Sequence, residues 1–373
     1  MDKKVLEKFE GIWREPKAVA RKWKEKNQGK VVGWIIPDAP EELILASGAL
    51  PIAILGAGIP FSRADAHFQG FACSYSRSLL ELISRGELDF LDALIIPHTC
   101  DAMRALDLVV KEMGGIKSVE TFRPPRLKDN PASEKYLREE LERIRNRLAE
   151  ITGHYPDLEE IRKASGTINH LKTALRSLKQ EMASGRVSAR EYFSAVRAGM
   201  AGDKEEVAKL ASELIEESKA RKPLQKAGKP ILLAGKVAEP IEIISEIEGS
   251  GFLIVDELLV NGSRYLESMV DLSQEPITGL VQAQMNKIPV AGFYHRKESR
   301  SERILKRFKA SRAQAIIYLI QKFCEPYELE VVGVEEDLKK AGIQILRLES
   351  DYQTSSLAPL RTRIDAFYEM LSR

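Results

Sequence analysis

Short apolar runs alternate with helical patterns through the first third of the chain. Three of these runs predict buried strands: KVVGWIIP (30–37), LPIAIL (50–55) and DALIIP (92–97). Stretches with helical spacing follow them at 40–48, 76–86 and 101–115. Strands that alternate with helices favour parallel pairing, so this part of the sequence predicts a doubly wound sheet.

The middle of the chain has a different period. Leu137, Leu141, Ile144 and Leu148 recur at spacings of three and four, and a similar pattern returns between residues 168 and 182. This spacing is typical of amphipathic helices. The polar run SKARKPLQKAGKP (218–230) that follows reads as a linker.

The alternating pattern resumes after this linker. Five further runs predict strands: PILLAG (230–235), FLIVDE (252–257), IPVAGFYH (288–295), AQAIIYLI (313–320) and IQILRLE (343–349). A helix is predicted around 239–248 and another at the end of the chain. We therefore expect an α/β protein with two doubly wound parallel-sheet (Rossmann-like) domains, at 1–125 and 226–373, and a helical insertion with its linker at 126–225.

Charge and composition narrow the class of protein. The 57 basic and 55 acidic residues leave a formal charge of +2. A charge this small gives the protein no overall electrostatic attraction for nucleic acid or an anionic membrane. The 19 uncharged residues of 43–61 have the length of a membrane span, but two prolines and three glycines divide them into a helix and a strand. No secretory signal opens the sequence, and three cysteines suit no disulfide framework. We expect a cytoplasmic protein that binds neither nucleic acid nor membrane.

The three cysteines occupy related positions. Cys100 lies four residues beyond Ile96, and Cys324 lies four residues beyond Ile320, at the ends of two predicted core strands. Both cysteines precede helix-like runs, as does Cys73. Ligands of doubly wound sheets gather outside the carboxyl ends of the strands. A helix N-terminus also favours thiolate, the metal-binding form of cysteine.

Three thiols at one locus leave several interpretations open. A structural zinc site normally has compact cysteine pairs and four ligands, and neither is present. A 4Fe-4S cluster takes one ligand per iron, so three cysteines would leave one iron open to a small ligand or substrate. The remaining interpretation is that each cysteine is simply a small buried apolar residue.

Several longer segments resemble a known family. KVVGWIIPDAPEELILASGALPIAILG, ADAHFQGFACSYSRSLLEL, LDFLDALIIPHTCDAMRAL, QKFCEPYELE and TRIDAFYEM occur in this order over almost the whole chain. Together they resemble the subunits shared by 2-hydroxyacyl-CoA dehydratases and ATP-dependent benzoyl-CoA reductases. The resemblance implies paired α/β domains and a 4Fe-4S cluster on Cys73, Cys100 and Cys324, with one iron not ligated by cysteine. Many relatives have His where this chain has Leu45, so no role for that histidine transfers.

The resemblance also implies a function and partners. A separate iron-sulfur activator that hydrolyses ATP would donate a low-potential electron, and a homologous larger subunit would complete the enzyme that passes it to an acyl-CoA. The cysteine segments look nearer to the smaller subunit of benzoyl-CoA reductases, so reduction of an aromatic acyl-CoA is our first expectation. A 2-hydroxyacyl-CoA dehydratase that eliminates water through a ketyl radical is the alternative. A non-catalytic electron carrier or scaffold is the third interpretation.

This chain has no ATP-binding motif of its own. Its Gly-Lys pair, in LLAGKVAEP, is followed by Val237 where a P-loop needs Ser or Thr, and the upstream glycine is missing. The ATPase must therefore be another protein.

A few other residues are candidates for the site. His98 and His67 precede two of the cysteines and are candidate proton donors, although a histidine bonded to a nearby loop is the simpler interpretation. Glu41 and Glu42 are candidates for substrate contact, or carboxylates that merely favour a helix start. The segment 295–312 carries eight Lys or Arg and two Glu, which suits CoA phosphates, activator docking or an ordinary solvated helix.

Overall fold

The first sheet is parallel throughout. The computed structural model describes the chain except residues 1–3, 224–227, 295–297, 353–356 and 373. Strands β1 (Val31–Ile35), β2 (Leu50–Ile54), β3 (Ala93–Pro97) and β4 (Val119–Phe122) pair in the order β2-β1-β3-β4. All residues of β1, β2 and β3 are buried, which explains why these strands read as unbroken apolar runs.

The second sheet repeats this topology. Strands β5 (Lys229–Gly235), β6 (Phe252–Leu258), β7 (Ala315–Gln321) and β8 (Gln344–Ser350) pair in parallel in the order β6-β5-β7-β8. The central strands β1 and β5 thus occupy equivalent places, as do β3 and β7. The prediction of two doubly wound parallel sheets is confirmed.

Helices cover both sheets. The first sheet carries α3 (Glu41–Ala46), the short 3-10 turn η1 (Ala64–Ala66), α4 (Ser74–Ser84) and α5 (Asp101–Met113). The second carries α10 (Glu242–Gly249), α11 (Ser263–Glu267), α13 (Arg300–Ser311), α14 (Glu325–Lys340) and α15 (Leu357–Met370). Helix α12 (Pro276–Met285) instead packs against the helices of residues 131–183. Helix α4 packs beside α5, α10 beside α15, and α13 beside α14.

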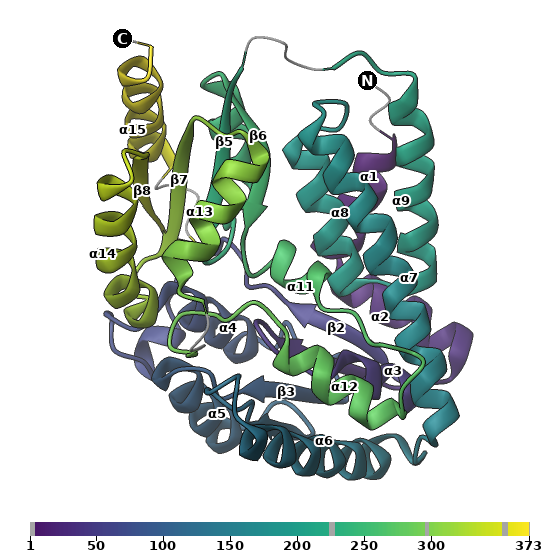
Figure 1. Cartoon of the computed structure of the whole chain (residues 1–373). Coiled ribbons are helices and arrows are strands. Elements are labelled where there is room, and N and C mark those ends of the chain that lie inside the picture. Colours follow the sequence, from purple (N-terminus) through teal and green to yellow (C-terminus); the bar gives the residue numbers. More distant parts are fainter. Residues whose placement is uncertain (1–3, 224–227, 295–297, 353–356, 373) are drawn as a thin grey trace.

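A helical segment stands beside the two sheets. In it, α7 (Leu158–Ala183), α8 (Ala189–Ala201) and α9 (Lys204–Lys219) pack together with the N-terminal helix α1 (Lys4–Arg14), which α2 (Pro16–Asn27) adjoins. Helix α6 (Pro131–Thr152) runs apart from them along the first sheet, where it packs against α3 and β4 (Figure 1). Capping boxes at Asp157 and Ser188 begin α7 and α8. Leu137, Leu141 and Ile144 are buried, as their spacing predicts. The exact domain boundaries stay a prediction.

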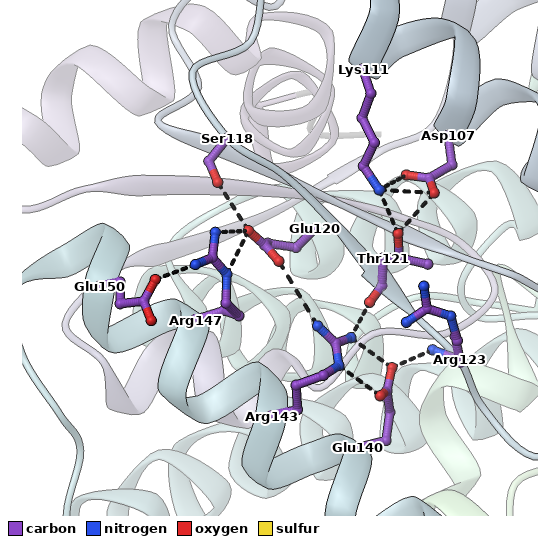
Figure 2. A network of polar contacts seen from close by, with 10 residues as sticks. All are labelled: Asp107, Lys111, Ser118, Glu120, Thr121, Arg123, Glu140, Arg143, Arg147 and Glu150. Carbon is purple, nitrogen blue, oxygen red and sulfur yellow. Dashed lines mark hydrogen bonds and ion pairs between the residues drawn. The ribbon is translucent and has the colours of Figure 1, made fainter.

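A polar network fastens α6 to the first sheet. Figure 2 shows Glu120 of β4 bonded to Arg147 of α6 at 2.8 Å, while Arg143 lies 2.7 Å from Glu140 and also contacts the backbone of Thr121. These bonds hold the short and partly polar β4 at the edge of its sheet.

One predicted strand is wrong. Residues 288–294 form no regular strand, and Tyr294 makes only an isolated bridge with Leu127, while His295 lies outside the described residues. Pro289 and Gly292 interrupt this apolar run, because proline lacks a ladder donor and this glycine has a φ of +84°. Among the described helices, none is both long and apolar enough to cross a membrane.

Candidate iron-sulfur site

The three cysteines begin three helices. Cys73, Cys100 and Cys324 are the N-cap residues of α4, α5 and α14. Cys100 follows β3 and Cys324 follows β7, so these two occupy equivalent places in the two sheets, each beside the point where the strand order reverses. Cys73 and Cys324 are buried, and Cys100 is partly exposed.

The fold brings the three thiols together around one lysine. Lys236, the residue after β5, places its Nζ 3.2 Å from the Sγ of Cys73. Cys324 lies within hydrogen-bonding reach of Cys73, and Lys236 interacts electrostatically with all three cysteines. We call each sheet with its covering helices an α/β region. Side chains from both α/β regions therefore meet at a single site.

Backbone contacts between the two regions fix this arrangement. The Ser74 amide at the start of α4 donates to the carbonyl oxygen of Lys322 at 3.0 Å, which joins the segments that carry Cys73 and Cys324. The Cys324 amide donates to the Gln321 carbonyl oxygen at 2.9 Å. Two cysteines 251 positions apart are thus held by the same interface.

Glycine is required where β5 ends. Gly235 has a φ of +116°, and a Cβ there would lie 2.1 Å from the carbonyl oxygen of Leu319 on β7. Beyond it, the Lys236 amide donates to that Leu319 oxygen at 2.8 Å, and the Lys236 carbonyl oxygen accepts from Val260 at 2.8 Å. The backbone of Lys236 is therefore held by β7 and by the turn that follows β6, and its side chain is directed to the thiols.

The thiols differ in their acidity. The hydrogen bond from Cys324 lowers the pKa of Cys73 well below its ordinary value; burial opposes this shift, and the charge of Lys236 adds to it. The same hydrogen bond, together with burial, raises the pKa of Cys324. Burial raises the pKa of Cys100. The hydrogen bond therefore favours the thiolate form of Cys73 and the thiol form of Cys324.

Lys236 stays charged in this environment. Burial alone would lower its pKa, but the charges of Cys324, Cys73 and Cys100 outweigh burial and raise the pKa above its ordinary value. The ammonium lies 3.2 Å from the Cys73 sulfur, where its charge favours the thiolate form of that side chain.

The donor set suits a cluster better than a single ion. Within the described part of the chain, no three or more His, Cys, Asp or Glu side chains lie close enough to hold one metal ion. In a 4Fe-4S cluster each thiolate binds a different iron, so the three sulfurs need not bind the same ion. Three cysteines at helix N-termini, one of them already acidic, have the chemistry that such a cluster requires.

His98 is a member of a hydrogen-bonded chain. Its Nε2 lies 2.8 Å from Oδ2 of Asp107, which also accepts from Thr121 at 2.8 Å and from Lys111 at 3.0 Å. Figure 2 shows how Lys111 and Thr121 hold this carboxylate. His67 lies exposed at the end of η1. A role as proton donor stays a prediction for both.

Glu41 and Glu42 lie in buried ion pairs with the helical segment. Glu41 contacts Lys204 of α9 and accepts from the hydroxyl of Tyr265 at 3.1 Å, and Glu42 lies 3.6 Å from Lys172 of α7. These contacts fasten α3 to the neighbouring helices. Contact with substrate stays a prediction for the two carboxylates.

Several arginines of the basic segment 295–312 are paired with acidic residues. In its described part, Arg300 pairs with Glu330 at 2.7 Å, and Arg307 bonds Asp256 at 2.6 Å and Glu267 at 2.7 Å. These arginines fasten α13 to its neighbours.

Sequence reasoning missed Lys236 and a tyrosine pair. The Tyr75 ring lies 5.3 Å from the Lys236 Nζ and stacks on Tyr352 at a centroid distance of 5.6 Å. Tyr352 also lines a cavity of about 660 Å³ that reaches Ile54 and Glu239, a size typical of ligand pockets. The Gly235-Lys236 pair can be recognised in the sequence, but it suggests a P-loop and not a lysine beside the cysteines. No sequence pattern predicts the role of the two tyrosines.

Comparison with known proteins agrees with this geometry. Residues 38–371 match the family described as 2-hydroxyglutaryl-CoA dehydratase, D-component, and the chain belongs to this family. It is 25% identical to the (R)-phenyllactyl-CoA dehydratase beta subunit of Clostridium sporogenes, over 99% of both chains. It is 26% identical to the lactoyl-CoA dehydratase beta subunit of Anaerotignum propionicum (98% of both) and 24% identical to a benzoyl-CoA reductase subunit of Thauera aromatica (94% of both).

The suspected family is therefore confirmed, and with it the class of protein. The relatives are named as dehydratase and reductase enzymes, and each is named as one subunit. The identities of 24–26% do not separate the dehydratases from the reductase.

Proposed function

We propose that this chain is the smaller iron-sulfur subunit of an enzyme complex that delivers a low-potential electron to an acyl-CoA thioester. The observation that carries the proposal is the meeting of Cys73, Cys100 and Cys324 around Lys236, where two α/β regions join. The full-length similarity to dehydratase and reductase subunits supports the same conclusion.

The three cysteines would hold a 4Fe-4S cluster and leave one iron without a cysteine ligand. The bound cluster supplies one-electron chemistry. Cys73 is prepared for this role because its thiolate form is favoured before iron binds. Since Cys324 reaches the site from the second region, the site is complete only when both regions are in place.

Two partners follow from this proposal. An electron of sufficiently low potential requires an activator that hydrolyses ATP, because this chain lacks a P-loop and ordinary ferredoxins lie near about −400 mV. A homologous larger subunit would complete the enzyme, in keeping with the relatives, which are themselves named as subunits.

The reaction has two candidates. Reduction of an aromatic acyl-CoA such as benzoyl-CoA is supported by the similarity to a benzoyl-CoA reductase subunit. Elimination of water from a 2-hydroxyacyl-CoA is supported equally by the similarity to two dehydratase beta subunits.

An anaerobic assay of the co-purified complex tests the proposal and separates these reactions. The complex should contain iron and sulfide, its EPR signal should change on addition of an acyl-CoA, and it should turn over only with the activator and ATP. Benzoyl-CoA, phenyllactyl-CoA and lactoyl-CoA are the substrates to compare. An iron-loaded complex that turns over none of them and shows no EPR response would instead be the carrier or scaffold.

Proton donation by His98 has its own test. We propose that His98, held by Asp107, supplies a proton during turnover. His98→Gln should lower kcat, because a glutamine amide does not supply a proton, while the iron content stays unchanged. His154→Gln is the matched control, because His154 is bonded to Glu160 at 2.9 Å in the same manner on the helical segment. Equal kcat values for His98→Gln and His154→Gln would show that His98 does not donate a proton in the reaction.

A further inference from the structure

Lys236 is built into the thiol site by the fold itself. Its backbone is bonded to Leu319 and Val260, and the residue before it must be glycine. Its Nζ lies 3.2 Å from the Cys73 sulfur and 5.3 Å from the face of Tyr75. The ammonium is therefore held against the sulfur that the proposal assigns to the cluster.

The position of this charge has an electrostatic consequence. Lys236 is the cation that acts on each of the three cysteines. The potential of an iron-sulfur cluster depends on its net charge, on hydrogen bonds to its sulfurs and on its exposure. Reduction adds one negative charge, so a fixed ammonium stabilises the reduced cluster more than the oxidised one.

We propose that Lys236 is a positioning residue that raises the reduction potential of the cluster, through its charge and its N–H···S bond to Cys73. The oxidised cluster gains one electron from an external low-potential reductant, and no bond is made or broken in this step. The inference rests on the proposed function, because it requires the cluster to be present.

A redox titration of the anaerobic complex, followed by EPR, tests this inference. Lys236→Met removes the charge and keeps a side chain of similar length. We expect it to disfavour the reduced cluster by about ten-fold or more, which corresponds to a potential lower by about 59 mV. Lys236→Arg keeps the charge and should remain close to the wild-type potential.

Lys229→Met provides the matched control. Lys229 begins the same strand, is similarly half-buried and carries the same charge, but it lies seven residues away, about 20 Å along β5. Its loss should leave the potential unchanged.

The outcomes separate this inference from the proposal on which it rests. A wild-type complex without iron contradicts the proposed function. An iron-loaded Lys236→Met complex with the wild-type potential overturns only the role of Lys236. A further neutral variant, Lys236→Gln, distinguishes a role in assembly. If Lys236→Met and Lys236→Gln both lose the cluster and Lys236→Arg keeps it, the positive charge at this position is needed for cluster assembly. That result would also overturn the proposed role of Lys236 in setting the reduction potential.

Discussion

The segments that follow β1 and β5, the equivalent central strands, hold opposite arrangements of charge. After β1, the fully buried Asp38 carboxylate accepts two bonds from Arg264, at 2.8 and 2.9 Å, and Lys287 lies 3.5 Å away. After β5, the Lys236 ammonium lies among three thiols. The Asp38 site is thus a carboxylate surrounded by cations. The Lys236 site is an ammonium surrounded by thiols, which become anions when they lose their protons.

This difference supports the proposal that the thiol site binds an inorganic partner and the Asp38 site does not. Burial would raise the pKa of Asp38, but Arg264, Lys287 and Lys128 outweigh it and hold that pKa far below its ordinary value. The protein itself thus neutralises the carboxylate. Three thiolates would face a single ammonium at the other site, and a positively charged iron-sulfur core would balance the excess.

Loss of the Asp38 carboxylate should have the largest effect on stability. Asp38→Asn leaves Arg264 and two lysines buried without their counter-charge, which should lower the free energy of unfolding by about 3–5 kcal/mol in urea denaturation. Asp65→Asn is the control, because Asp65 pairs with Arg77 at an exposed position and should cost less than about 1 kcal/mol. Equal costs for the two variants would contradict the buried role of Asp38.

Removal of Lys128, one of the three cations near Asp38, should stabilise the protein, and the size of this effect should depend on pH. Burial lowers the pKa of Lys128 to about 8, although Asp38 opposes the shift. At pH 7, Lys128→Met should therefore raise the free energy of unfolding by about 1–3 kcal/mol.

The direction of this pH dependence follows from proton uptake. The unfolded chain keeps its lysine proton up to about pH 10.4, so between pH 8 and that value it binds more protons than the folded chain. The wild type should gain stability over this range, and the advantage of Lys128→Met should disappear. The exposed Lys26→Met should show no such change, and a constant difference across this range would contradict the account.

The tyrosine contact between the two regions should have a moderate effect. The Tyr352 hydroxyl donates to the carbonyl oxygen of Leu55 at 2.8 Å, so Tyr352→Phe removes a buried hydrogen bond next to the thiol site. Thermal unfolding should show a loss of about 1 kcal/mol. The exposed Tyr155→Phe should show almost none.

Loss of a thiol should barely affect the metal-free chain. Serine is a preferred N-cap residue, so Cys100→Ser should change the free energy of unfolding by no more than about 0.5 kcal/mol. Ser188→Ala, which removes the capping box of α8, should cost about 1 kcal/mol. A Cys100→Ser loss above that of Ser188→Ala would mean that the thiol is a packing residue.

Apolar patterning predicted most of the fold. Seven of the eight strands were predicted from their apolar residues. Strands β1, β2, β3 and β7 read as unbroken apolar runs because every residue in them is buried, whereas the edge strand β8 is largely exposed or half-buried and alternates apolar with polar residues. The exception, β4, has four residues and includes Glu120, which pairs with α6. The false strand at 288–295 shows that apolar content alone does not make a strand.

The site was only partly predictable. The positions of Cys100 and Cys324 after equivalent strands are visible in the sequence, because topology decides where strand ends meet. The contribution of Lys236 depends on the close approach of Gly235 to β7, which no local pattern reveals. The ion pairs of Glu41 and Glu42 depend on lysines more than 120 positions away.

The iron and sulfide content of Cys324→Ser, purified anaerobically with its partner, tests the central claim most directly. The account predicts about four irons per wild-type chain at this site. It also predicts loss of this cluster in the variant, while Ser188→Ala keeps it. A folded Cys324→Ser chain with the full wild-type iron content would contradict the account, since the two regions would then not share a cluster.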